Sequence, residues 1–109
     1  MPRQKTYSNQ KLTDESLLAL TIISICDLSG KEIIKEIQIQ TKNKFILSTS
    51  TIYQIIKNLK NYGFVDQIKK IGKQKYIHIT DYGLEILYRE IKRRKDYLTT
   101  LNNIIEDNK

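Results

Sequence analysis

Residues 48–65 read S-T-S-T-I-Y-Q-I-I-K-N-L-K-N-Y-G-F-V, and this stretch decides the fold of the chain. Its apolar residues fall at helical spacing: Ile52, Ile55, Ile56 and Leu59. They predict a helix with one face against a core. Ser48 is a suitable N-cap, and Gly63 suits the left-handed residue just past the helix end. The opposite face is polar, with hydroxyls, amides and lysine: Thr49, Ser50, Gln54, Lys57, Asn58 and Asn61.

Two helices are predicted before this segment. Thr13 is a candidate N-cap, and acidic residues follow it in the first turn of a helix that runs to about Cys26. Residues 28–30, Leu-Ser-Gly, break that helix, and residues 31–40 form a second amphipathic helix. Cys26 lies among apolar residues, so a small buried side chain is the favoured interpretation.

After Gly63 the hydrophobic period changes from about 3.6 toward 2. Residues 64–69 and 75–80 are predicted to be two strands, joined by the loop 70–74 with its glycine and lysines. A final helix begins near residues 80–81 and continues to about Ile105. The fold class is therefore mainly α with a small β-hairpin (α+β), in the order helix, helix, helix, hairpin, helix.

Positive charge is concentrated in one part of the chain. The net charge is +7, and residues 42–75 hold eight lysines against one acid, Asp66, so the other residues balance to zero. A basic block beside a neutral remainder is typical of proteins that bind polyanions. A solvated lysine-rich surface is the alternative, and charge alone does not decide between the two.

Three helices and a basic hairpin are the parts of a winged helix-turn-helix, whose third helix enters the major groove of DNA. Hydroxyls and amides can bond to base edges, while lysines contact phosphates. The helix residues predicted at the DNA include Ser48, Thr49, Ser50, Gln54, Lys57 and Asn58. The predicted hairpin contacts are Lys69, Lys70, Lys73, Gln74 and Lys75.

The chain also resembles the PadR-type winged-helix regulators. The likeness rests on residues 47–53 (L-S-T-S-T-I-Y), Gly63-Phe64-Val65, residues 72–76 (G-K-Q-K-Y) and residues 79–83 (I-T-D-Y-G), in the right order. It extends over roughly residues 12–105 and implies a homodimeric transcription regulator, usually a repressor. It also implies that Thr49, Ser50, Thr51, Tyr53 and Gln54 lie at the DNA, with Lys73 and Lys75 in the wing.

The last helix carries an apolar repeat with one charged member. Its members are spaced alternately three and four residues apart: Leu84, Leu87, Ile91, Arg94, Leu98, Leu101 and Ile105. A helix of ~25 residues spans ~37 Å, which is longer than the core of so small a domain requires, so a dimer interface is predicted. The predicted domains are a flexible basic arm (1–11), a winged-helix domain (12–83) and a dimerisation helix (84–109).

Other functions find little support in the sequence. No cofactor or metal is expected, because His78 is the one histidine and no phosphate-binding loop or nucleophile motif is present. We expect no enzyme activity, no membrane segment and a cytoplasmic location. Two alternatives to a regulator stay open: a plasmid or phage partition protein on DNA repeats, and a protein-interaction module without DNA binding. The sequence does not define an effector.

Overall fold

The structure is a computed structural model that describes residues 12–109 as four helices and a three-stranded sheet. The helices are α1 (Asp14–Ile25), α2 (Gly30–Gln40), α3 (Thr49–Asn61) and α4 (Asp81–Asp107). The strands are β1 (Leu28–Ser29), β2 (Val65–Ile71) and β3 (Gln74–Ile79), in the sheet order β1-β3-β2. The predicted winged helix-turn-helix with a long last helix is confirmed. The predicted arm, residues 1–11, lies outside the described residues.

The predicted helix ends are formed by the residues that the sequence indicated. The Thr13 hydroxyl accepts a hydrogen bond from the Ser16 amide at 3.1 Å, which caps α1. The Ser48 hydroxyl accepts one from the Thr51 amide, also at 3.1 Å, and caps α3. Past the other end of α3, Gly63 has a φ of 81°. Local capping therefore fixes both ends of α3.

The segment between α1 and α2 is more ordered than predicted. Ser29 and Glu32 form a capping box, with the Ser29 amide 3.0 Å from the Glu32 carboxylate and the Glu32 amide 3.3 Å from the Ser29 hydroxyl. The strand β1 pairs with β3, placing Leu28 opposite Ile77. Cys26 was predicted to be buried, and this is wrong: α1 ends one residue earlier and the side chain is exposed.

The hairpin is longer than predicted, and its turn is shorter. Lys70 pairs with Lys75 and Ile71 with Gln74, so only Gly72 and Lys73 remain in the turn. Gly72 has a φ of 60° and Lys73 does not share the positive sign, which fits a type II′ turn. The short turn thus brings one further lysine, Lys70, into the paired strands.

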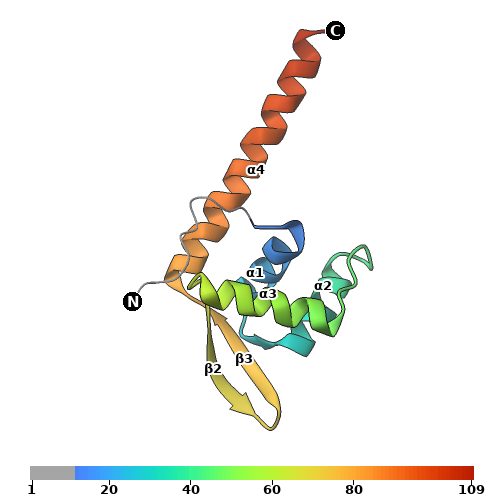
Figure 1. Cartoon of the computed structure of the whole chain (residues 1–109). Coiled ribbons are helices and arrows are strands. Elements are labelled where there is room, and N and C mark those ends of the chain that lie inside the picture. The colour runs from blue at the N-terminus through green and yellow to red at the C-terminus, as the bar shows by residue number, and fades with distance from the viewer. Residues whose placement is uncertain (1–11) are drawn as a thin grey trace.

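The core lies where α1, α2 and α3 meet the base of the sheet. Figure 1 shows these three helices together, the hairpin extending from them, and α4 leaving in the opposite direction. Buried side chains from all of these elements fill the core, among them Leu20, Ile33, Ile52, Leu59, Phe64, Ile77 and Ile86. The molecule is elongated, with extents of 59 × 38 × 21 Å.

Thr80 joins the end of α3 to the start of α4. Its amide donates to the Phe64 carbonyl at 2.9 Å, and its hydroxyl donates to the Gly63 carbonyl at 2.7 Å. The same hydroxyl accepts from the Gly83 amide at 2.9 Å and so caps α4. Glycine is required at position 83, because a Cβ there would collide with the Phe64 carbonyl. Helix α3, the hairpin and α4 therefore share one fixed junction.

The first part of α4 belongs to the core of the winged-helix domain. Ile86 is fully buried and Leu87 is only 2% exposed. Leu84 packs against the same core. The prediction that Leu87 lines a dimer interface is therefore corrected, because its own domain covers the side chain. Leu84 is only partly covered, so its place in an interface stays a prediction. The predicted boundary between residues 83 and 84 falls inside α4, and a separate dimerisation unit stays a prediction.

Candidate nucleic-acid interface

Helix α3 exposes the polar side chains that the sequence analysis singled out. Its apolar side is buried, and its opposite side is open to solvent over the whole length of the helix. All eight predicted contact residues are exposed: Ser48, Thr49, Ser50, Thr51, Tyr53, Gln54, Lys57 and Asn58. We call this set the α3 polar face. Tyr53 is 53% exposed and is the one large apolar side chain of α3 that solvent reaches.

Hydrogen bonds within the α3 polar face already hold several of these groups in place. The Gln54 amide nitrogen donates to the Asn58 side-chain oxygen at 3.2 Å, which orients both amides along the helix. The Ser48 hydroxyl is engaged as the cap of α3 and also donates to the Thr51 hydroxyl at 2.9 Å. Ser48 is therefore a structural cap first, while Gln54 and Asn58 retain free donor and acceptor positions for an external partner.

The hairpin places its cations close to one another. Lys69, Lys70, Lys73 and Lys75 are exposed, and Gln74 is partly buried. The ammonium of Lys69 lies 5.2 Å from the centre of the Tyr76 ring, a cation–π contact. Lys70 and Lys75 stand directly opposite each other on neighbouring strands. Like charges in that position destabilise a sheet, so an anion held between them would relieve a repulsion that the free protein carries.

A lysine cleft runs between α3 and the hairpin. It has a volume of about 490 Å³ and is lined by ten residues: Gly30, Tyr53, Ile56, Lys57, Lys60, Asn61, Gln67, Lys73, Lys75 and Ile77. Four of these are lysines and none is acidic. Gly30 keeps the cleft open at Tyr53, since a Cβ at position 30 would come within 2.9 Å of the tyrosine ring. The geometry suits a negatively charged chain with polar and aromatic contacts along its length.

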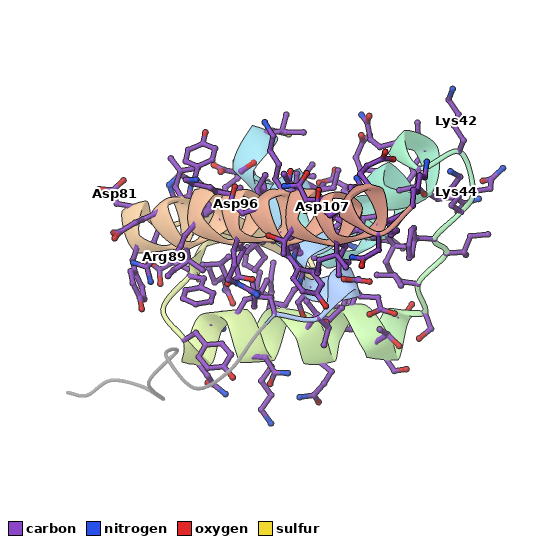
Figure 2. The ribbon with its side chains drawn as sticks, turned by 90° about the horizontal axis from the view of Figure 1, so that it is seen from above. Lys42, Lys44, Asp81, Arg89, Asp96 and Asp107 are labelled. Atoms are coloured by element: carbon purple, nitrogen blue, oxygen red, sulfur yellow. The ribbon has the colours of Figure 1, made fainter. Side chains whose placement is uncertain are left out.

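Several residues beside this interface were missed as contacts. Lys60 and Gln67 line the lysine cleft together with Asn61. Lys60 is one helical turn past Lys57, a spacing that could have identified it, whereas Gln67 gains its place only through strand pairing. Figure 2 shows Lys42 and Lys44 projecting from the loop that leads into α3. Both are exposed and enlarge the positive surface near the start of α3.

Two other kinds of site come into question for residues 12–109, a metal site and a membrane-spanning helix. Over residues 12–109 no three side chains of the metal-binding types come together, and no helix is apolar and long enough to span a membrane. His78 is half exposed, with its Nδ1 2.7 Å from the Asp27 carboxylate. That pair ties the loop after α1 to β3, which is a structural role.

Beyond the core, α4 exposes a second kind of surface. Four predicted interface residues are open to solvent: Ile91 (43% exposed), Leu98 (60%), Leu101 (38%) and Ile105 (58%). We call them the α4 apolar row. Tyr97 and Ile104 are exposed beside it and were missed. Arg94, predicted in the same interface, bonds to the start of α1 in its own chain and is partly exposed, so its place in an interface stays a prediction.

Comparisons with known proteins agree with this architecture. The model of the transcriptional regulator PadR-like family matches residues 19–89. A PadR-like transcriptional regulator from Bacillus cereus is 25% identical, with 84% of this chain and 90% of that chain covered and a TM-score of 0.69. A transcriptional regulator from Clostridium thermocellum is 18% identical, with 85% and 97% covered and a TM-score of 0.73.

A third similar structure includes nucleic acid. Bacillus subtilis PadR, solved in complex with operator DNA, is 22% identical to this chain, with a TM-score of 0.66. The alignment covers 72% of this chain and 47% of that one. A search of curated proteins found no match.

Proposed function

The chain belongs to the PadR-like family of transcriptional regulators, and from that premise we propose that it binds specific double-stranded DNA sites as a homodimer and represses transcription in the cytoplasm. One observation carries the proposal: the α3 polar face and the lysine cleft form one continuous surface. The first supplies groups that distinguish bases, and the second supplies cations for phosphates. The family is one of transcriptional regulators, so we propose no enzyme activity.

In the proposed complex, the N-terminal turns of α3 lie in the major groove and the hairpin lies along the neighbouring backbone. The lysine cleft between them then holds the phosphates of one strand, contacted by Lys57 and Lys60 from α3 and by Lys73 and Lys75 from the hairpin. The solved PadR–operator complex supports DNA as the partner. In this proposed complex a DNA phosphate also lies between Lys70 and Lys75 and reduces their mutual repulsion.

The proposed homodimer forms through the α4 apolar row. The row repeats at helical spacing, so two copies related by a two-fold axis can face each other with the same residues. A shallow apolar groove beside Ile91, lined by Leu17, Leu18 and Phe45, adds further surface on the same side. In Figure 1 the hairpin and the C-terminal end of α4 point in opposite directions, so pairing through α4 leaves the hairpin free.

The experiment that tests this function removes charge from the hairpin. Bound sequences are first selected from a random DNA pool, and affinity is then measured by fluorescence anisotropy over a range of salt concentrations. The double variant Lys73→Ala/Lys75→Ala should lower the slope of log K against log salt by about 2, because each lost phosphate contact lowers it by about 1.

The matched control, Lys73→Arg/Lys75→Arg, keeps both charges and should keep the slope. The proposal would be contradicted if the wild-type protein selected no sequence and bound DNA no more tightly than a negatively charged control protein. That result would favour a protein-interaction module without DNA binding. Selected sites in tandem repeats, in place of inverted half-sites, would favour the partition alternative, which the comparisons do not support.

A further inference from the structure

Arg94 lies at the point where α4 leaves the winged-helix domain. Glu90, one turn earlier, is 2% exposed, and every residue from Lys95 to the C-terminus is exposed. Arg94 itself is the last residue of α4 with a partly covered side chain. Whatever fixes the direction of the outer half of α4 must therefore act at or before this position.

The guanidinium of Arg94 binds two groups at the start of α1. Its Nη1 donates to the Asp14 carboxylate at 2.6 Å, and its Nη2 donates to the Leu12 carbonyl at 2.6 Å. Its Nε lies 3.9 Å from the Glu90 carboxylate on α4 itself. The planar fork of an arginine makes such contacts directional, so the side chain defines an angle between α4 and α1.

A second fixed point of α4 is the Thr80 junction at its first turn. About 20 Å of helix separates Thr80 from Arg94. Between them α4 carries the apolar packing of Ile86 and Leu87, which is non-directional, and the buried Glu90 carboxylate, which Arg93 of the same helix binds. Two polar anchors at the ends of this segment set the axis of α4, and the remaining helix extends that axis to the α4 apolar row.

We propose that Arg94 is a positioning residue that sets the distance and orientation of the two DNA-binding surfaces in the dimer, and through them the half-site spacing that the regulator accepts. This inference rests on the proposed homodimeric DNA binder. A tilt of about 10° over a further ~20 Å of helix shifts a domain by about 3–4 Å, close to the rise of one base pair, given that 10–10.5 base pairs span 34–36 Å. Small changes at Arg94 thus translate into changes of spacing.

The variant Arg94→Met removes the guanidinium and keeps an apolar stem of similar length. The fold should survive, because Arg93 remains bonded to the buried Glu90 carboxylate at 2.6 Å and Asp14 is largely exposed. Arg89→Met is the matched control: Arg89 lies on the same helix (Figure 2) and its ion pair, with Glu85, stays within α4. If Arg94→Met lost its circular dichroism signal, Arg94→Lys, which keeps the charge without the fork, would replace it.

The measurement uses Cys26, the only cysteine of the sequence, which is exposed near the end of α1. A spin label there gives one label per subunit, and pulsed electron double resonance then reports the distance between the two domains of a dimer. We expect a narrow distribution for the wild type and for Arg89→Met. For Arg94→Met we expect a shift or broadening of about 3 Å or more, with the dimer mass unchanged.

DNA provides the second part of the test. Inserting one base pair between selected half-sites should weaken wild-type binding by about tenfold or more, and Arg94→Met should lose most of that discrimination while its affinity for a single half-site stays the same. A dimeric Arg94→Met with the wild-type distribution and discrimination would overturn the inference and leave the proposed function intact. A wild-type protein without any distance between labels would overturn the homodimer, and the inference with it.

Discussion

Helix α3 and the outer half of α4 are both amphipathic, and they differ in which face stays exposed. α3 buries its isoleucines and leaves hydroxyls, amides and lysines in solvent. The outer half of α4 leaves Leu98, Leu101 and Ile105 exposed, and no other element of residues 12–109 covers them. An exposed polar face needs no partner for stability, whereas an exposed apolar row marks an interface. The exposed side chains of each helix therefore indicate its proposed partner: the polar face of α3 suits DNA, and the apolar row of α4 suits a second subunit.

The largest effect is expected from substitutions in the α4 apolar row, the proposed dimer interface. Leu98→Asp with Leu101→Asp would place unpaired charges in the proposed interface, so the dimer should separate into monomers of 12.9 kDa. Each monomer can occupy one half-site, and affinity for the full site should fall by about 10²–10⁴-fold because the two binding events are no longer linked. Light scattering and anisotropy measure the two quantities.

The control for that variant is Thr100→Asp with Asn103→Asp, which adds the same charges on the opposite side of α4, where both residues are exposed. It should stay dimeric. If the Leu98/Leu101 double variant remained a dimer, the subunits would pair through another surface. The exposed apolar row of α4 would then not be the dimer interface.

An intermediate effect is expected on the α3 side. Gln54→Ala should cost roughly 1–3 kcal/mol on the selected site and leave binding to random DNA almost unchanged, because an amide that bonds a base edge carries sequence information. Gln40→Ala on α2 removes another exposed glutamine, whose contact is with Glu36 of the same helix, and should change neither affinity. Equal losses on selected and random DNA would assign Gln54 to the phosphates.

The smallest effect should come from the lysines of α4. Lys92 is bonded to Asp96 at 3.0 Å with both side chains largely exposed, so Lys92→Ala with Lys95→Ala should change the free energy of unfolding by less than about 0.5 kcal/mol. The salt slope of DNA binding should stay at the wild-type value, in contrast to the hairpin variant. If the slope instead fell by about 2, these two lysines would contact phosphates. The DNA surface would then include α4, and α4 would not serve the dimer alone.

Local sequence signals were sufficient for most of the fold. The ends of α3 follow from Ser48 and Gly63, because a cap and a left-handed glycine act within a few residues. The strand β1 was missed because two residues are too short to show a period. The spacing of Ser29 and Glu32 is a capping-box signature and would have placed the start of α2 correctly.

The errors at the candidate sites share one physical cause. The repeat of α4 keeps its spacing from Leu84 to Ile105, with Arg94 as its one charged member, but periodicity cannot show that Leu87 faces its own core while Leu98 faces outward. Arg94 meets Leu12 across more than eighty positions of the chain, a contact that no local pattern contains. The α3 polar face was predictable because it depends on one helix alone.

The exposure of the outer half of α4 has a consequence for how the chain orders itself. Residues 95–107 are the outer end of the continuous helix α4, and no other element of residues 12–109 covers them. In a single copy of the chain this end lacks the packing that holds the first half of α4, so it should fray from its free end, and its exposed ion pairs add little. For the proposed dimer, association would also suppress this fraying, so the occupancy of DNA would rise steeply with the cellular amount of the protein.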